Sequence, residues 1–315
     1  MKIIKIVQEI IKLHKIGFPN TSSKKQYLID VLNLWYSLKN ILGNERKVIQ
    51  HSNLNLTDMW SKYNAYIDFQ NKYYSTKDYL NAPVVRFTTG GFHSKNPLKF
   101  KTIDKNQKHS IETISFKLEK IFSTVPYNQW HSNIQFFLEI LNNFKESKID
   151  LYSKLKDLTI VEFGPGTGIS SLLYQSISGH TFACYDLPQM QTIQKFVHKK
   201  YFENAPEKLN KFNYFTNLQG LEKFLKGRKF CFISNFAFSE TSLSLRLEFE
   251  EILSRSEFAL FSSNKIMSGV DNLEYFDTLS ERLLNHTYLN THFNNIENLQ
   301  GFQKRHKIHL FNKNI

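Results

Sequence analysis

The sequence predicts an α/β protein whose second half forms a mostly parallel sheet with helices on both faces, preceded by a mostly helical first half. Three observations lead to this prediction. Short β-rich runs alternate with helical segments from Leu151 onward, as in a parallel sheet. Apolar residues before that point follow helical spacing. Two extended runs then close the sequence, too near each other for a parallel crossover, so we expect an antiparallel hairpin.

The first half, residues 1–150, places apolar residues every three or four positions, with polar residues between them. The stretch from about 81 to 102 contains two prolines and two adjacent glycines, which break this spacing and predict a loop or a short hairpin. A helix is expected from Trp130 to Phe144. We therefore expect a helical N-terminal domain over residues 1–150.

The second half, residues 151–315, is expected to form a separate sheet domain with a helix near Leu273 to Leu284. Its seven predicted strands span 158–163, 181–186, about 213–215, 229–235, 258–263, 286–293 and 307–311. The last two of these strands form the expected hairpin.

The net charge of +13 is unevenly distributed along the chain. Residues 1–150 hold 22 Lys or Arg and 12 Asp or Glu, whereas residues 151–315 hold 19 and 16, so the two halves contribute +10 and +3. A basic half fits an anionic partner, such as nucleic acid, a nucleotide-linked substrate or an acidic membrane surface. An ordinary solvated surface explains it equally simply, and the Lys-rich, Arg-poor composition favours that interpretation.

Both cysteines, Cys184 and Cys231, lie inside apolar strand-like runs, so we expect buried free thiols and a reducing, cytoplasmic setting. The first 15 residues carry a charge every few positions, and no segment has the uninterrupted apolar stretch of a secretion signal or a membrane span. The basic amphipathic start could make peripheral contact with an acidic membrane, although packing against the protein's own core is favoured.

A glycine-rich turn follows the first strand of the second half. Positions 161–168 read Val-Glu-Phe-Gly-Pro-Gly-Thr-Gly, and such glycines allow a tight bend and let a ligand lie against the backbone. The dinucleotide pattern GxGxxG fails because Ile169 and Ser171 stand where a third small residue is needed, and no Gly-Lys-Ser/Thr of a phosphate-binding P-loop follows. The turn therefore predicts a nucleotide-like ligand without either phosphate-binding pattern.

This turn resembles the first motif of class I S-adenosylmethionine-dependent methyltransferases, in which an acidic residue and any residue precede GxGxG. The resemblance implies a Rossmann-like sheet of seven strands and S-adenosyl-L-methionine as cofactor. It also implies that Glu162 contacts the amino-acid part of the cofactor. Asp186, 22 positions after Gly164, would hold both ribose hydroxyls. The implied cofactor-binding residues are Glu162, Phe163, Gly164, Gly166, Thr167, Gly168, Asp186, Leu187, Asn217, Asn235 and Phe236.

The segment after the fourth strand bears on the methyl acceptor. Members that methylate base amines often carry Asn/Asp-Pro-Pro-Tyr/Phe there, whereas positions 234–240 read Ser-Asn-Phe-Ala-Phe-Ser-Glu, without the prolines. This segment, the Asp-Leu-Pro at 186–188 and the helical first half resemble a group of sugar O-methyltransferases of bacterial surface polysaccharide synthesis. The resemblance implies methyl transfer to a hydroxyl of a nucleotide sugar or surface glycan, with residues 1–150 as a cap that binds the acceptor.

Two residues are candidates for the general base that such a transfer requires. Glu240 follows the fourth strand, where the acceptor normally lies, although it fits a solvent-facing helix start equally well. His131 lies where a helical cap could close over the cofactor, although a His beside a Trp is more often structural. We expect no metal, because His306 and His309, three apart on a strand, point to opposite faces.

Two alternatives remain open at this stage. The basic N-terminal half could grip phosphates in an RNA methyltransferase. The chain could also be a non-catalytic cofactor-binding subunit that keeps Glu162 and Asp186. The sequence leaves the oligomeric state undetermined.

Overall fold

The computed structural model describes residues 99–100, 103, 105–121, 127–267, 270–293, 296–297 and 306–314. The expectations for residues 1–98, including the basic amphipathic start, lie outside the described residues.

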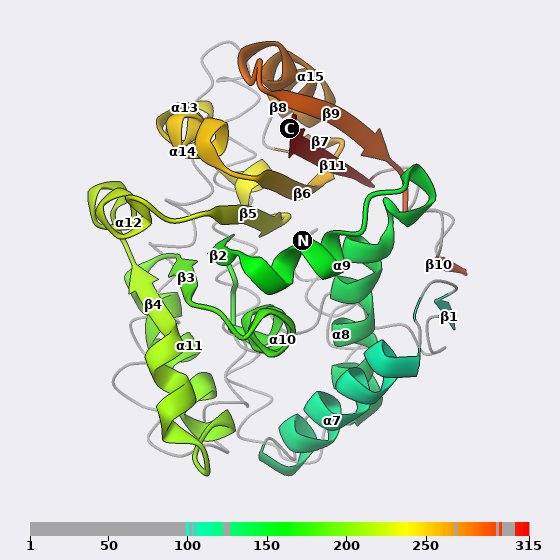
Figure 1. The fold of residues 1–315 in the computed structure, drawn as a ribbon, viewed down its shortest axis with the longest axis vertical. Coiled ribbons are helices and arrows are strands. Elements are labelled where there is room, and N and C mark those ends of the chain that lie inside the picture. The colour runs from blue at the N-terminus through cyan, green and yellow to red at the C-terminus, as the bar shows by residue number, and fades with distance from the viewer. Residues whose placement is uncertain are drawn as a thin grey trace, which may run out of the picture.

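Seven strands form the central sheet, in the order β4-β3-β2-β5-β6-β11-β9 (Figure 1). The first five along the chain are parallel to one another, and β11 runs antiparallel to both β6 and β9. All seven predicted strands and the closing antiparallel pair are thereby confirmed, and the sheet is the Rossmann-like one expected from the resemblance to class I methyltransferases. The strands are β2 (Thr159–Phe163), β3 (Phe182–Tyr185), β4 (Phe212–Phe215), β5 (Phe230–Asn235), β6 (Phe258–Asn264), β9 (His286–Thr291) and β11 (His306–Lys313).

Helices cover both faces of this sheet (Figure 1). One face carries α7 (Lys105–Ile121), α8 (Tyr127–Asn142), α9 (Leu151–Lys154), α10 (Ile169–Ser178) and α11 (Pro188–Tyr201). The other face carries α12 (Leu218–Leu225), α13 (Leu243–Glu248), α14 (Glu250–Arg255) and α15 (Asn272–Arg282). Short 3-10 helices are η1 (Lys145–Ser147), η2 (Leu155–Asp157), η3 (Pro206–Lys211) and η4 (Ala237–Glu240).

Alternation along the strands divides the core into two clusters. In β2, Ile160 packs with the α7–α11 side, whereas Val161 and Phe163 pack with the α12–α15 side. This is the period-2 pattern of a strand buried on both faces. Helices α7 and α8 contribute buried residues such as Leu118 and Trp130 to the same cluster as the strands, so the described part of the first half packs directly on the sheet.

The stretch expected to be a loop or short hairpin contains β1 (Lys99–Phe100), which pairs with β10 (Ile296–Glu297) in antiparallel register. The two strands lie side by side at one edge of the molecule (Figure 1). A two-residue pairing with so distant a segment has no signature in local spacing. A second small pair, β7 (Ile266–Met267) with β8 (Val270–Asp271), precedes α15.

Two local expectations, on the cysteines and on the two histidines of β11, are also confirmed. Cys184 and Cys231 are buried free thiols. His306 meets the ring of Phe236, whereas His309 stacks on Phe276 across the sheet, so the two imidazoles lie on opposite faces of β11. Within the described ranges, none of the helices has the length and apolar character to cross a bilayer.

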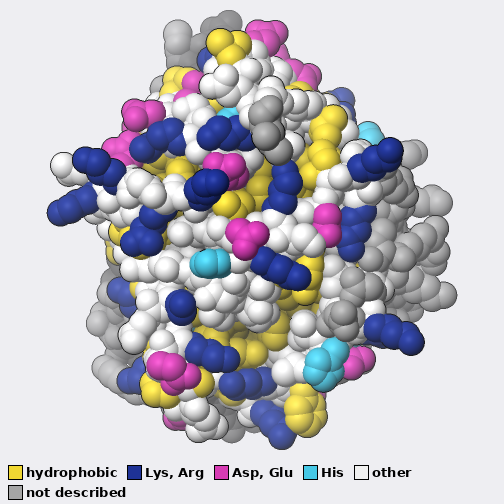
Figure 2. All heavy atoms as spheres, in the orientation of Figure 1, with side chains coloured by type: hydrophobic (Ala, Val, Ile, Leu, Met, Phe, Trp, Pro, Cys, Tyr) yellow, Lys and Arg dark blue, Asp and Glu magenta, His cyan; other side chains and the backbone are white. Residues whose placement is uncertain are grey.

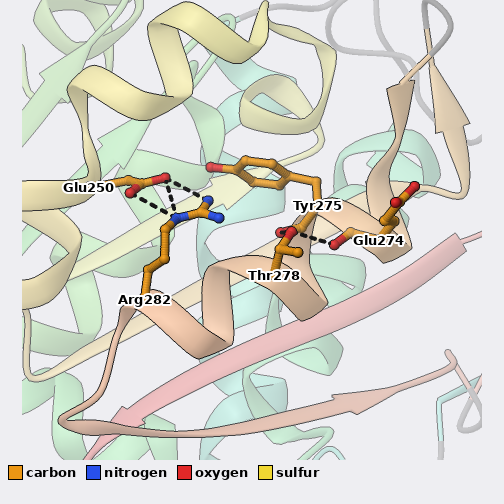
Figure 3. A network of polar contacts seen from close by, with 5 residues as sticks. All are labelled: Glu250, Glu274, Tyr275, Thr278 and Arg282. Carbon is orange, nitrogen blue, oxygen red and sulfur yellow. Dashed lines mark hydrogen bonds and ion pairs between the residues drawn. The ribbon is translucent and has the colours of Figure 1, made fainter.

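Helices α14 and α15 are joined by an ion pair between Glu250 and Arg282 (Figure 3). The guanidinium Nη2 lies 2.7 Å from Glu250 Oε1, and Nε donates to both carboxylate oxygens. Such two-point geometry is the strongest form of this contact. Beside it, the ring of Tyr275 supports the guanidinium of Arg246 at 4.7 Å, which connects α15 to the segment after β5.

Candidate active site

The candidate site lies where the direction of strand connection reverses. The chain runs outward from β2 to β3 and β4, then returns to place β5 on the other side of β2. In open parallel sheets, ligands bind in the crevice outside the carboxyl ends of the strands at such a point. Here the glycine turn that follows β2 meets η4, which follows β5. A Cβ built on Gly164 would lie 2.2 Å from Cβ of Ala237 in η4.

All three glycines of the turn adopt positive φ, at +67° for Gly164, +58° for Gly166 and +84° for Gly168. This region is costly for residues with a Cβ. At Gly168, a Cβ would also lie 2.6 Å from Nε2 of His198. The turn therefore needs its glycines both for backbone conformation and for close packing against η4 and α11.

Glu162 lies on β2 directly before the turn and is 1% exposed. The carboxylate accepts hydrogen bonds from the hydroxyls of Ser170 and Ser171 in the first turn of α10, at 2.5 and 2.8 Å. Its two oxygens thus tie β2 to the helix that begins after the glycine turn. Burial raises the pKa of Glu162 to about 7, against the lowering effect of the two serine hydroxyls.

Asp186 follows β3 and is half-buried at the same edge of the sheet. Its Oδ1 accepts from the backbone N–H of Leu187 at 2.8 Å. Its Oδ2 accepts from Gly166 N–H at 3.3 Å and from Gln194 Nε2 at 2.8 Å. Burial raises the pKa of Asp186 to about 7, even though these three donors favour the charged form.

Two side chains of α11 hold the glycine turn from the other side. Gln194 Nε2 donates to the carbonyl of Gly166 at 2.9 Å, and His198 Nε2 lies 2.9 Å from the carbonyl of Gly168. A carbonyl can only accept, so His198 carries its proton on Nε2, and Nδ1 accepts from the Tyr214 hydroxyl at 2.7 Å. Burial lowers the pKa of His198 to about 4, which keeps the ring neutral at pH 7.

Sequence reasoning missed Gln194 and His198. The available signal was their spacing of four residues on the helix after Asp-Leu-Pro, which puts both side chains on one face. That spacing alone does not show that the face meets the glycine turn.

The charge of this site is unusual. Among the described residues, the polar contacts of Glu162 and Asp186 are with hydroxyl, amide and backbone N–H groups rather than with a Lys or Arg. Each carboxyl holds its proton more tightly in the folded chain than in the unfolded chain, where its pKa is near 4. These groups therefore reduce stability as pH rises from about 4 to about 7. A bound cation would relieve this cost.

The end of β5 forms the adjoining wall. Ser234 Oγ donates to the carbonyl of Phe163 at 2.9 Å and accepts from Phe238 N–H, so it joins the end of β2 to η4. Asn235 Nδ2 donates to the Tyr174 hydroxyl at 3.1 Å, while its buried Oδ1 has no hydrogen-bond partner among the described residues. Such a buried acceptor is costly unless another group satisfies it.

Phe236 adopts φ +68° and ψ −38°, a strained conformation for a residue with a side chain. Its ring lies nearly parallel to Phe136 of α8 and to Phe293, with centroids 6.4 Å from each. Phe136 and Phe293 are themselves buried and lie 5.4 Å apart. This three-ring packing holds the strained residue at the carboxyl end of β5.

Glu240 ends η4 and is half-buried, not the solvent-facing residue of the simpler interpretation. Burial raises its pKa to about 7. The neighbouring backbone is held by fully buried Arg246, which donates to the carbonyls of Ser239 at 2.6 Å and Thr241 at 3.1 Å. Arg246 also donates to Asn272 Oδ1 at 2.8 Å. The turn that carries Glu240 is therefore fixed on both sides of it.

His131 lies on α8 and is half-buried. The charged groups acting on it are Glu112 and Lys108 of α7, and Gln135 of its own helix forms a hydrogen bond with it. Burial lowers its pKa. Its described surroundings thus belong to the α7–α8 pair, whereas Glu240 ends η4, the 3-10 helix whose Ala237 meets the glycine turn.

The remaining predicted cofactor residues occupy different settings. The ring of Phe163 packs among Tyr185, Phe238 and other rings of the core cluster on the α12–α15 side of the sheet. Thr167 is buried, and half-buried Leu187 packs against the core cluster on the α7–α11 side of the sheet. Asn217 is exposed and caps α12 by accepting from Gly220 N–H at 2.8 Å. Among the side chains that the structure describes, no group of three or more His, Cys, Asp or Glu is arranged to hold a metal ion.

No protein-family model matches this sequence, and no curated protein matches it in a sequence search. Several solved structures resemble parts of it. The methyltransferase domain of bacterial CtHen1 is 14% identical, with a TM-score of 0.41, covering 55% of this chain and 99% of that domain. A SAM-dependent methyltransferase from Aquifex aeolicus is 13% identical, with a TM-score of 0.37, covering 55% of this chain and 90% of its own. WbdD, solved with a kinase inhibitor, is 15% identical, with a TM-score of 0.37, covering 56% of this chain and 40% of WbdD. Likenesses this weak do not indicate a substrate, and the fold assignment rests on the order and direction of the strands.

Proposed function

We propose that this protein binds S-adenosyl-L-methionine at the glycine turn and transfers its methyl group to a hydroxyl of a sugar, in a nucleotide sugar or a surface glycan. The observation that carries the cofactor part is the pairing of a positive-φ glycine turn with two carboxyls, buried Glu162 and half-buried Asp186, that have no described Lys or Arg partner. A dinucleotide or nucleoside triphosphate would bring phosphate charges to the glycine turn, where the carboxyl of Glu162 would repel them. A sulfonium and an ammonium group would be attracted.

The residues present fit this cofactor. The three glycines of the turn have no Cβ atoms, so a ligand at the carboxyl ends of the strands can lie directly against the backbone. Asp186, which follows β3, offers a carboxylate oxygen for a ribose hydroxyl. Glu162 fixes the start of α10 beside the turn, because its two oxygens accept from the hydroxyls of Ser170 and Ser171. S-adenosyl-L-methionine, when bound, supplies an electrophilic methyl group.

Glu240 is the proposed general base. A base with a pKa near the working pH combines a useful ionised fraction with sufficient proton affinity. Burial raises the pKa of Glu240 to about 7. Its role is to accept the proton of the acceptor hydroxyl as the oxygen attacks. Arg246 acts as a positioning residue, because it holds the carbonyls on both sides of Glu240.

The hydroxyl acceptor is supported by the segment Ser234–Glu240, which offers a carboxyl with a raised pKa and lacks the prolines of amine-methylating relatives. Much of the excess positive charge that would favour RNA falls on residues 1–98, outside the described structure. On the face in Figure 2, Lys and Arg side chains are spread among neutral and acidic ones rather than gathered into one stripe.

Isothermal titration calorimetry of the full chain with S-adenosyl-L-methionine, NAD and ATP tests the cofactor. We expect binding of S-adenosyl-L-methionine alone, and binding of NAD or ATP instead would overturn the assignment. Methyl-labelled cofactor mixed with nucleotide sugars, glycans or RNA then tests the acceptor. Label in RNA but in no carbohydrate would contradict the sugar acceptor, and cofactor binding without transfer to any of them would favour a non-catalytic subunit.

A further inference from the structure

The hydrogen bonds of Asp186 limit what its carboxylate can accept. A carboxylate offers about four acceptor positions, two on each oxygen. Both positions of Oδ2 are taken, by Gly166 N–H and Gln194 Nε2, and one position of Oδ1 is taken by Leu187 N–H. One position remains. Asp186 alone therefore cannot accept from both hydroxyls of a ribose, as the family resemblance implies.

Gln194 provides an unused acceptor beside it. The side chain is fully buried, and within the part of the chain that the structure describes its Oε1 has no hydrogen-bond partner. The orientation of the amide follows from its contacts, because the carbonyl of Gly166 and Asp186 Oδ2 both require a donor. The nitrogen must face them, so the unpaired atom is the oxygen of the amide whose nitrogen contacts Asp186.

A buried amide oxygen without a donor is costly, and such groups in native proteins usually have a specific explanation. A ribose presents two adjacent O–H donors. The site presents one free position on Asp186 Oδ1 and an unused oxygen on Gln194. Donors and acceptors match in number and chemistry.

We propose that Gln194 is a second ribose-binding residue, whose Oε1 accepts one hydroxyl of the nucleoside diol while Asp186 Oδ1 accepts the other. This inference rests on the proposed function, because it assumes that the ligand contains a ribose. It assigns Gln194 two tasks: its nitrogen fixes the glycine turn and the carboxylate, and its oxygen recognises the ligand.

The experiment measures, by calorimetry, the dissociation constant of each protein variant for ligands that carry or lack one ribose hydroxyl. The ligands are S-adenosylhomocysteine and its 2′-deoxy and 3′-deoxy forms. With the wild-type chain, we expect each deoxy ligand to bind about 2- to 12-fold more weakly, the effect of one hydrogen bond. We expect Gln194→Leu to bind S-adenosylhomocysteine more weakly than the wild-type chain does. We also expect one of the two deoxy ligands to bind this variant with the same affinity as S-adenosylhomocysteine, because the hydroxyl that it lacks no longer has an acceptor.

A purely structural role for Gln194 gives a different pattern. All three ligands would then weaken by the same factor in Gln194→Leu, and this result would overturn the proposal. Gln191→Leu is the matched control, since Gln191 lies one turn earlier on α11 and its Nε2 contacts only the backbone carbonyl of Asp186. We expect it to affect the three ligands equally.

A fallback variant and two further outcomes complete the test. If the Leu variant fails to fold, Gln194→Met repeats the measurement with an unbranched side chain of similar length. If the wild-type chain binds S-adenosylhomocysteine but tolerates loss of either hydroxyl, the ribose assignment is wrong while the proposed function stands. If the wild-type chain binds none of the three ligands, the proposed function fails and this inference fails with it.

Discussion

Substitution of Gly164 by alanine should separate the glycine turn from η4. The added Cβ would lie 2.2 Å from Cβ of Ala237, whereas carbon atoms in contact lie about 3.5–4.0 Å apart. One of the two segments must therefore move by more than about 1 Å. Overpacking of this kind costs about 1–3 kcal/mol, and the φ of +67° adds about 1–2 kcal/mol for a residue with a Cβ. We expect a total loss of about 2–5 kcal/mol.

Gly227→Ala is the matched control. Gly227 has a similar φ of +73°, but a Cβ there would meet no atom within 4 Å. It should lose only the conformational part, about 1–2 kcal/mol. Unfolding in urea gives both values, and the difference isolates the contact with Ala237.

The same pair of variants tests the site. A displacement of about 1 Å near reacting groups can lower a rate by about 10²-fold, so Gly164→Ala should lose methyl transfer to that extent while Gly227→Ala keeps it. Equal stability losses in the two variants, or unchanged transfer in Gly164→Ala, would refute the claim that the turn and η4 form one site.

Three other substitutions or conditions give direct tests. Glu240→Gln should lower the rate of methyl transfer by about 10²- to 10⁴-fold with little change in S-adenosylhomocysteine affinity, because it removes a base and not a cofactor contact; a normal rate at pH 7 would exclude Glu240. Affinity for S-adenosyl-L-methionine should increase from about pH 6 to about pH 8, because Glu162 and Asp186 lose their protons over this range. The increase should be larger than for S-adenosylhomocysteine, whose sulfur is uncharged. Calorimetry that finds no pH dependence for either ligand would contradict the charge argument. Arg246→Met should destabilise the chain by about 3 kcal/mol or more in urea unfolding, since each buried acceptor left unpaired costs roughly 1–3 kcal/mol. Arg246→Lys should lose less, and a neutral effect of both would show that the η4 carbonyls do not need this side chain.

Central strands such as β2, β5 and β6 could be predicted because each is a compact, mostly apolar run. β2, for example, is buried along its whole length, and Thr159 and Glu162 are its two polar residues. The positions of Glu162 and Asp186 followed from their spacing to the turn. Their burial did not, since it depends on α10 and α11 closing over them.

The residues that sequence reasoning missed have meaning only through tertiary contact. Gln194 and His198 are ordinary polar residues on a helix until the carbonyls of Gly166 and Gly168 are placed against them. Glu240 illustrates the intermediate case, because its place after β5 could be predicted but its burial could not. The pairing of β1 with β10 joins two dipeptides from opposite ends of the described chain, and no local pattern indicates it.

The place of β11 in the sheet has a consequence for how the protein folds. β11 follows β9 in sequence, yet it lies between β6 and β9. Neither of these strands can complete its pairing until β11 has been synthesised and inserted. Until then, the edge of β6 stays open, and such exposed edges recruit strands from other chains. We expect partly synthesised or slowly folding chains to aggregate through β6, so chaperones that shield this edge should increase the yield of folded protein.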